Sequence, residues 1–434
     1  MSIVEITATE IAAHGTPLVR ACAIDRPAEG ESADVYHVTI EGWVVGRDAP
    51  AEAVEIVCAG NVLRRVAVDV PRPDVGDVFP MLSWAARSGF RSWLSVVGLP
   101  PAHPLALDAV FADGTRSRFA AVRGSHRPVA TTCEPSLWPV MVSTIGRAGS
   151  TWLMRLLAHH PEVVVHPTYP YELRHARYWW HTLQVLTDPA DPSDSALPDD
   201  FQTRRGWTGH NPYRPEPFAA TPAAAAWSGR THVEETADFC LRTVDEGYRR
   251  IAADLGKPNA RCFAEKGRAD HLPWLAWELY PEAREIFLVR DFRDVVSSML
   301  AFNRRAGRIA FGPAGATTDA EVLRFIREVP VAMLERSWPA RRDRALLVRY
   351  EDLIARPAEE LGRVLAHLGL DDRAATVGDV LARASRDDAE TRAHLTSRDA
   401  AASLGRWRTT LPPDVQALAN DLFRDPLAQF GYDG

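Results

Sequence analysis

The stretch IGRAGSTWLMRLL, residues 145–157, has the residue types of an anion-binding loop that leads into a helix. Its two glycines allow a sharp backbone turn, and Ser150 and Thr151 stand at the start of the predicted helix. Backbone N–H groups at a helix N-terminus point toward a bound anion, and the two hydroxyl groups add further donors. Arg147 can reach back over the bound group. An ordinary glycine-containing turn is the alternative interpretation.

A Walker A loop, which holds the phosphates of a nucleoside triphosphate, requires the pattern G-x-x-x-x-G-K-[ST]. Here Ser150 directly follows Gly149, so the lysine of that pattern is missing. The sequence therefore disfavours a nucleoside triphosphatase. A P-loop-type kinase stays an alternative function, although no Walker B aspartate is evident at a strand end.

A second candidate anion loop lies in FLVRDFRDVVSSMLAF, residues 287–302. Arg290 ends an apolar run that is typical of a buried strand, and Ser298 lies eight residues later in a predicted helix. Asp294 is placed where its side chain can cap that helix. One arginine at a strand end is more often part of a surface ion pair. Two such loops on neighbouring strands indicate a ligand that carries two separate phosphates.

This combination resembles the sulfotransferases that use 3′-phosphoadenosine 5′-phosphosulfate (PAPS), a donor with a phosphosulfate on one side and a 3′-phosphate on the other. GRAGSTW (146–152) resembles the family's 5′-phosphosulfate loop, and VRDFRDVVSS (289–298) resembles its 3′-phosphate motif. RYEDL (349–353) and SLGRWRTTL (403–411) resemble later segments of the same family. The motifs occur in the expected order, and the resemblance covers residues 138–434 approximately.

The resemblance implies PAPS as donor, 3′-phosphoadenosine 5′-phosphate (PAP) as product, and a reaction that needs no metal. It implies that the donor is held by Gly146, Arg147, Ala148, Gly149, Ser150, Thr151 and Trp152 on the 5′ side, by Arg290 and Ser298 at the 3′-phosphate, by Tyr350 near the adenine and by Arg406 over the nucleotide. Two positions depart from common members. Phe292 stands where proline is common, and Arg147 replaces the lysine of phenol- and hydroxysteroid-type enzymes.

Lys266 is a candidate catalytic residue because lysine is rare in this chain. Arginine supplies 48 of the 50 basic residues, and the only lysines are Lys257 and Lys266. In sulfuryl transfer the bridging oxygen of the donor gains negative charge, and a compact ammonium group suits a charge that shifts during the reaction. The resemblance places a lysine from an equivalent strand near the transferred group. Arg147 is the second candidate cation, and we expect the strand of Lys266 at the edge of the sheet.

Glu172 is the candidate general base. The Glu-Leu-Arg run that it begins resembles the Glu-Thr-Arg of tyrosylprotein sulfotransferases, although about four extra residues precede it here. Partial burial among aromatic residues would raise the pKa of its carboxyl group, which suits a base. His166 is the alternative base. The nearby aromatic residues form either a stacking platform for the acceptor or part of the core; they are Tyr169, Tyr171, Tyr178, Trp179 and Trp180.

The elements that must position these residues indicate an α/β fold. Apolar runs at 139–144, 285–290 and 345–350 alternate with helical patterns, which predicts a parallel sheet flanked by helices, the P-loop-like sulfotransferase fold. Residues 129–434 would form this domain, with an irregular insertion at about 187–230 that is either disordered or a lid.

Residues 1–128 predict a separate all-β, sandwich-like domain, because short β-branched runs are separated by turn signals. Tight hairpin turns are expected at 59–61 and around 113–114, and a linker at 124–138. We find no catalytic arrangement of titratable residues there. A glycan-binding protein whose sulfotransferase-like domain is inactive is therefore a further alternative.

The net charge of −7 argues against a nucleic-acid partner, which would need a basic surface. The five cysteines show no metal-binding spacing, so we expect small buried side chains and no metal site. No signal peptide and no membrane span is predicted, which indicates a soluble cytoplasmic protein. The expected acceptor is a hydroxyl group of a glycan, natural product or other small molecule. The sequence specifies neither that acceptor nor the oligomeric state.

Overall fold

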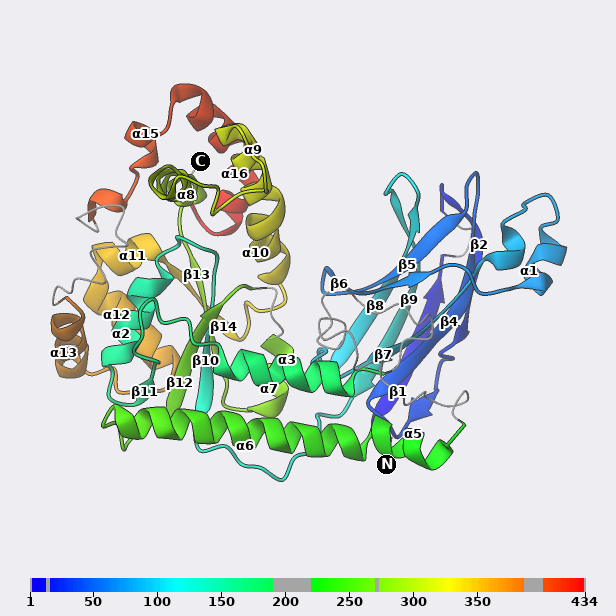
Figure 1. Ribbon diagram of the computed structural model, residues 1–434, viewed down its shortest axis with the longest axis horizontal. Coiled ribbons are helices and arrows are strands. Elements are labelled where there is room, and N and C mark those ends of the chain that lie inside the picture. The colour runs from blue at the N-terminus through cyan, green and yellow to red at the C-terminus, as the bar shows by residue number, and fades with distance from the viewer. Residues whose placement is uncertain (1, 13–15, 190–219, 270–272, 386–400, 433–434) are drawn as a thin grey trace. The chain divides into compact units, whose positions relative to one another are not determined.

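The computed structural model describes residues 2–12, 16–189, 220–269, 273–385 and 401–432. The chain forms two compact units (Figure 1). The first contains Met1–Glu134, Arg177–Val244 and Trp274–Leu279, and the second contains Pro135–Ala176, Asp245–Pro273 and Tyr280–Gly434. The division into domains at 1–128 and 129–434 stays a prediction. Residues 190–219, which make up most of the predicted insertion, lie outside the described residues.

The first unit contains two antiparallel sheets, which confirms the predicted all-β region. The larger sheet has the strand order β3-β1-β9-β8-β5-β6, and the smaller one has the order β2-β4-β7. The strands are β1 Val4–Ile11, β2 Val19–Arg26, β3 Ser32–Ala33, β4 His37–Gly46, β5 Ala51–Cys58, β6 Asn61–Ala67, β7 Gly89–Ser95, β8 Ala102–Phe111 and β9 Arg116–His126. Buried and exposed residues alternate along much of β8, as expected for a strand with one face in a core.

Both predicted hairpin turns of this unit are present. Ala59 and Gly60, between β5 and β6, have φ angles of 48° and 77°, which is the backbone of a tight two-residue hairpin turn. Between β8 and β9, Gly114 has a φ angle of 81°, and the Asp113 carboxylate accepts the N–H of Thr115 at 2.9 Å. The turn residues recognised in the sequence therefore connect the paired strands β5 and β6, and β8 and β9.

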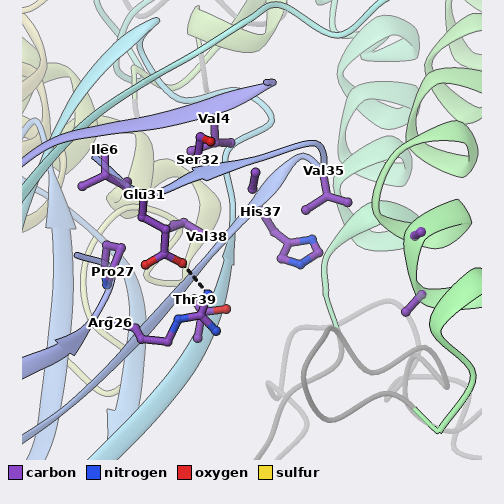
Figure 2. Close-up of a pocket in the computed structure, with 13 residues that line it drawn as sticks. Val4, Ile6, Arg26, Pro27, Glu31, Ser32, Val35, His37, Val38 and Thr39 are labelled. Atoms are coloured by element: carbon purple, nitrogen blue, oxygen red, sulfur yellow. Dashed lines mark hydrogen bonds and ion pairs between the residues drawn. The ribbon is translucent and has the colours of Figure 1, made fainter. Parts of the chain in front are cut away.

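The first unit also contains a cavity of about 180 Å³ (Figure 2). Its lining is mainly apolar and includes Ile6 of β1, Val38 of β4 and Ala225 of helix α5 (Pro222–Gly229). Its Arg26 side chain forms an ion pair with Glu31. Because that cation is already neutralised and the walls are apolar, this cavity does not have the converging cations that an anionic donor requires.

The second unit is built on a five-stranded parallel sheet with the order β11-β12-β10-β13-β14. Its strands are β10 Trp138–Ser143, β11 Val163–Val164, β12 Cys262–Gly267, β13 Arg284–Val289 and β14 Ala345–Arg349. The three apolar runs correspond to β10, β13 and β14, so the predicted parallel α/β sheet is confirmed. The expected edge position of the Lys266 strand is wrong. The short β11 pairs with the outer side of β12 and forms that edge.

Helices cover both faces of this sheet (Figure 1). Phe287 and Val289 of β13 face a core shared with α8 and α16, whereas Ile286 and Leu288 face a core shared with α2, α12 and α13. This alternation explains why the strand reads as an unbroken apolar run. The helices of the second unit are α2 Ser150–His159, α8 Phe292–Ala306, α9 Asp319–Ile326, α10 Ala332–Ser337, α11 Tyr350–Ala355, α12 Pro357–His367, α13 Ala374–Ala384, α15 Trp407–Thr410 and α16 Pro413–Gln429.

The remaining helices are α1 Pro73–Val78, α3 His175–Thr187, α6 Thr231–Asp254 and α7 Pro273–Leu279, of which the last three have residues in both units. Within the described part of the chain, no helix is both long and apolar enough to span a membrane. All five cysteines are free thiols; Cys58, Cys240 and Cys262 are buried, whereas Cys22 and Cys133 are partly exposed.

Candidate active site

The loop between β10 and α2 has the conformation of an anion-binding turn. Gly149 caps α2 with a left-handed backbone at φ 92°, and Arg147 is also left-handed at φ 67°. A Cβ atom on Gly149 would lie 2.1 Å from the Tyr350 ring, so only glycine fits between this loop and that ring. The N–H groups of Ser150 and Thr151, the first two residues of α2, have no partners within the helix and are available to a ligand, whereas the N–H of Trp152 donates to the Gly149 backbone oxygen at 3.0 Å.

The other predicted loop residues support this turn. Gly146 lies against the Phe311 ring, which a Cβ atom would approach to 2.9 Å. Ala148 is fully buried, and Trp152 packs against the core that includes α2. These three residues therefore shape the loop through packing.

The two predicted anion loops meet directly. The Nε atom of Arg147 donates to the Oγ atom of Ser298 in α8 at 3.0 Å. The Arg290 guanidinium donates to the backbone oxygen of Arg147 at 3.3 Å. The contact follows from the sheet, because β10 and β13 are paired neighbours and each loop follows one of them. An anion bound at either loop would therefore lie close to the other.

Arg290 connects the first loop to the later segments of the chain. It is 5% exposed, and its guanidinium lies over the Tyr350 ring at 4.7 Å from the centroid. It also donates to the backbone oxygen of Ser403 at 2.5 Å. Its Nε atom is buried and has no hydrogen-bond partner among the described residues. A buried, incompletely satisfied guanidinium is suited to a phosphate ligand.

Several arginines concentrate positive charge here. Burial lowers the pKa of Arg147, and the neighbouring guanidinium groups of Arg290, Arg406 and Arg305 lower it further. Burial likewise lowers the pKa of Arg406, which is close enough to Arg290 to be repelled by it. Like charges held together in this way favour a bound anion.

Asp294 does not cap α8, contrary to the sequence-based prediction. Asp291 caps it, accepting the N–H of Arg293 at 2.9 Å. Asp294 instead accepts the N–H groups of Gly405 at 2.7 Å and Trp407 at 3.0 Å, which holds the segment that carries Arg406 against α8. Burial raises the pKa of the Asp294 carboxyl group.

Phe292, at the position where proline is common in the resembling family, is the first residue of α8. Its ring is fully buried and packs against Phe423 and Phe430. Packing therefore fixes the start of this helix, where a proline would do so through its restricted backbone.

Lys266 links the first loop to the candidate base. Its Nζ atom donates to the Thr151 hydroxyl at 3.1 Å and lies 3.2 Å from a carboxylate oxygen of Glu172. The side chain is nearly buried, and burial lowers the pKa of its ammonium group, whereas the adjacent Glu172 carboxylate opposes that shift. The two residues that sequence reasoning proposed as cation and base are therefore in contact.

Glu172 is more open than expected. Its side chain is 46% exposed, so the partial burial that we expected is not found, and Arg174 lies 3.8 Å away as a second cation. The rival base, His166, is partly exposed and makes no hydrogen bond or ion pair with the other predicted site residues among those described. The geometry favours Glu172 over His166 as the candidate base, because an exposed carboxylate beside the loop is accessible to an acceptor.

The aromatic residues divide between the two units. Tyr169 and Tyr171 belong to the same unit as Glu172, and their rings meet edge to face at 6.1 Å. Tyr178, Trp179 and Trp180 belong to the first unit, where Trp180 is buried. Trp180 is thus a core residue.

Lys257, the other lysine, has a structural role. Its ammonium group donates to the backbone oxygens of Ala158 at 2.6 Å, His160 at 2.9 Å and Val163 at 2.6 Å. These oxygens lie at the end of α2 and in β11, so a three-donor ammonium group matches three converging acceptors. Burial lowers the pKa of Lys257 to about 8.

Sequence reasoning missed Glu265 and Tyr248, which lie beside the candidate site. Glu265 precedes Lys266 in β12 and is 3% exposed. The signal that could have revealed it is a carboxylate within an otherwise apolar strand, CFAEKG, because a buried carboxylate requires partners.

Among the residues that the structure describes, no group of three or more His, Cys, Asp or Glu side chains is arranged to hold a metal ion. The site is instead a cluster of cations with one accessible carboxylate. Such an arrangement can bind an anion, stabilise charge that develops on it and accept a proton from a second substrate.

Comparison with known proteins gives one family. Residues 139–374 match a family model described as the sulfotransferase family. The solved structures that resemble the chain include a sulfotransferase domain from the olefin synthase of Synechococcus PCC 7002 (20% identity, 71% of this chain, 97% of that chain, TM-score 0.38). They also include the mouse sulfotransferase SULT7A1 complexed with PAP (13% identity, 67% of this chain, 85% of that chain, TM-score 0.37). A third is the sulfotransferase STF9 of Mycobacterium avium (16% identity, 69% of this chain, 78% of that chain, TM-score 0.36). No curated protein matches the sequence.

Proposed function

The chain belongs to the sulfotransferase family, and we propose that it transfers the sulfuryl group of PAPS to a hydroxyl group of a small acceptor. The family model covers just over half of the 434 residues, including both anion loops. A glycan or a natural product is the acceptor class that we propose, and a cytoplasmic location stays a prediction.

The contact between Arg147 and Ser298 carries this proposal. It joins the loop after β10 to the helix after β13, and this contact supports the proposal that the two candidate anion loops act as one site. A donor with separate 5′ and 3′ phosphates needs such a pair of elements. The residues present also fit the donor's charge, because the buried Arg290 guanidinium retains an N–H group without a partner among the described residues.

The proposed roles follow from the contacts. The N–H groups and hydroxyls of Ser150 and Thr151 would hold the 5′ side together with Arg147. Arg290 and Ser298 would hold the 3′-phosphate. Tyr350, whose ring lies against both Gly149 and Arg290, would face the adenine.

PAPS would supply an activated sulfuryl group, so that one S–O bond forms to the acceptor as the bond to the bridging oxygen breaks. The protein's part is to align the reactants and to stabilise the charge on the leaving oxygen. In this proposal Lys266 does the second, which is supported by the contact of its ammonium group with Thr151 at the start of α2. Glu172 would accept the acceptor's proton.

Lys266 and Glu172 are paired in the structure, and this has a consequence for the base. An anion near Thr151 competes with Glu172 for the same ammonium group. Moving Lys266 toward that anion weakens the attraction that favours the ionised carboxylate, and a carboxylate released from a cation is a stronger base. Donor binding would therefore prepare Glu172 for proton transfer.

Thermal denaturation with PAP, with ATP and without ligand tests the proposal. A ligand that binds the folded chain raises its stability by about 2.7 kcal/mol at 100 times its Kd. We expect PAP to raise the melting temperature more than ATP at equal concentration, because ATP has no 3′-phosphate for Arg290. Stabilisation by ATP alone would contradict the proposed function.

A further inference from the structure

Glu265 forms two short hydrogen bonds inside the second unit. One carboxylate oxygen accepts the backbone N–H of Ala176 at 2.6 Å and the hydroxyl of Tyr248 at 2.6 Å. Ala176 is in the first turn of α3, where N–H groups have no partners within the helix. Glu265 therefore caps the start of this helix from a neighbouring strand, and Tyr248 of α6 helps to fix the carboxylate.

Lys266, the next residue of β12, contacts the same chain segment at its other end. Its ammonium group lies 3.2 Å from Glu172, four residues before Ala176. Because successive residues of a strand point to opposite faces of the sheet, Glu265 and Lys266 contact the segment 172–176 from opposite faces of β12. The contacts are Ala176 with Glu265 and Glu172 with Lys266.

The Tyr248 ring is itself held by packing. It stacks on Phe263 of β12, with ring centroids 3.9 Å apart and an angle of 8° between the planes. The His175 ring meets its edge at 5.7 Å. Gly247 allows this contact, because a Cβ atom there would lie 2.3 Å from the His175 ring. Packing of the ring therefore fixes the position of the Tyr248 hydroxyl that donates to Glu265.

We propose that Glu265, held by Tyr248, is a positioning residue that fixes Glu172 relative to Lys266. This inference rests on the proposed function only in the role that it gives to Glu172. A side chain that makes no contact with the reacting atoms can control the rate through the base, because a displacement of about 1 Å can cost about 100-fold in rate. Loss of the bond to Ala176 removes one of the two hydrogen-bonded or ionic contacts described above between β12 and the segment that carries Glu172.

Hydrogen–deuterium exchange tests the positioning without any substrate. The variants are Glu265→Gln, which removes the charge, and Tyr248→Phe, which removes only the hydroxyl and keeps the ring stack. We expect exchange at residues 171–177 to become about 10-fold faster in both, whereas residues 145–152 keep their rate, because local opening is governed by local bonds. Unchanged exchange at 171–177 in both variants would overturn the proposal.

Asp245→Asn is the matched control. Asp245 lies one turn before Tyr248 in α6, and its carboxylate accepts the N–H groups of Ser136 at 2.8 Å and Leu137 at 3.1 Å. The variant weakens comparable bonds on the same helix without touching residues 171–177. Faster exchange at 171–177 in this variant as well would show a general loosening of the unit, and would also count against the proposal.

Turnover provides a second test. The probe reaction is hydrolysis of PAPS, in which the oxygen of water bonds to sulfur, the bond to the bridging oxygen breaks with its electron pair left on PAP, and PAP, sulfate and two protons result. We expect Tyr248→Phe to lower kcat by about 10-fold with PAP affinity within about twofold. In a Glu172→Gln background the same substitution should have no further effect, because residues that act through one group are not additive. An equal loss in both backgrounds would refute action through Glu172.

The two hypotheses can fail separately. If the unmodified protein does not bind PAP, the proposed function fails while the exchange experiment still reports on the segment of Glu172. If PAP binds and exchange is unchanged in the variants, the positioning role alone fails.

Discussion

The Lys266 ammonium group lies 3.2 Å from the Glu172 carboxylate, so the candidate catalytic cation and the candidate base neutralise each other in the free protein. Each would have to exchange that contact for a substrate during a reaction cycle. Because Lys266 also contacts Thr151 at 3.1 Å, the exchange needs only a small movement toward the anion loop.

Glu172→Gln should therefore abolish proton transfer and leave donor binding intact. We expect turnover to fall by about 10²–10⁴-fold, the usual contribution of a general base, with PAP affinity within about twofold. Release of sulfate from PAPS, measured alongside calorimetric titration with PAP, checks both expectations. Glu359→Gln, on an exposed face of α12, is the control. Full activity of Glu172→Gln would transfer the role to another group, and His166→Asn would then be the next variant.

Arg290→Ala should weaken PAP binding by more than about 1.5 kcal/mol, because a charged hydrogen bond to the 3′-phosphate is lost. Arg284→Ala is the control at the other end of the same strand, where the guanidinium is partly exposed and bonds to Glu282. Calorimetric titration of both variants with PAP gives the comparison. Equal affinities of the two variants would remove Arg290 from the 3′ site.

Gly149→Ala should weaken PAP binding at the proposed nucleotide site far more than a similar substitution elsewhere. The added methyl group would lie 2.1 Å from the Tyr350 ring, so that the ring or the loop must move. Gly307→Ala is the matched control, since its φ of 64° is also left-handed but the space around its Cβ position is open. We expect Gly307→Ala to cost about 1 kcal/mol of stability and to bind PAP normally. Binding of PAP by Gly149→Ala with normal affinity would contradict the described contact.

Asp294→Ala should weaken PAP binding through the segment that carries Arg406. Asp294 holds the N–H groups of Gly405 and Trp407, so its loss releases Arg406 from the site. The effect should therefore be smaller in an Arg406→Ala background, by at least about 0.5 kcal/mol, as for residues that act through one contact. Titration of the two single variants and the double variant with PAP completes the cycle. Strict additivity would show that Asp294 acts elsewhere.

Because His103 is buried, we expect the first unit to lose stability at acid pH. Burial lowers the pKa of His103 to about 4, and the nearby His126 adds to the shift, with Glu278 behind His126 at 3.8 Å. An unfolded histidine titrates near pH 6.5, so between about pH 6.5 and 4 the unfolded chain binds a proton that the folded chain does not. Stability should fall as the pH falls through this window.

Removing the imidazole should reduce that dependence. We expect the loss of unfolding free energy between pH 7.5 and 4.5 to be smaller in His103→Gln than in the unmodified protein, by up to about 3 kcal/mol. Urea denaturation at the two pH values measures it. The same loss in both proteins would mean that His103 is charged in the folded state.

The strands that carry the anion loops were predictable from sequence, and the strand order was not. The strands β10 and β13 are buried on both faces, and the edge strand β14 contributes Ala345 to one core and Val348 to the other, so all three read as apolar runs. The position of β12 inside the sheet depends on pairing with Val163–Val164, which is too short to show a pattern. Local sequence contains no information on such a pair.

The difference between local patterns and long-range contacts also explains why the predicted capping role of Asp294 was wrong. Its place in the first turn of a helix favours a capping role, which is a local interaction. Its real partners, Gly405 and Trp407, are 111 and 113 residues away in the chain. Only the folded arrangement of α8 and the late segment shows that contact.

The scarcity of lysine has a practical consequence. An amine-acylating reagent can modify only two lysines, and Lys257 directs all three of its N–H donors to backbone oxygens. The other, Lys266, is enclosed between Thr151 and Glu172. The extent of Lys266 acylation, measured by mass spectrometry on one peptide, should therefore report the fraction of the protein that has a ligand at the proposed anion site. A bound nucleotide should shield that amine without any engineered label.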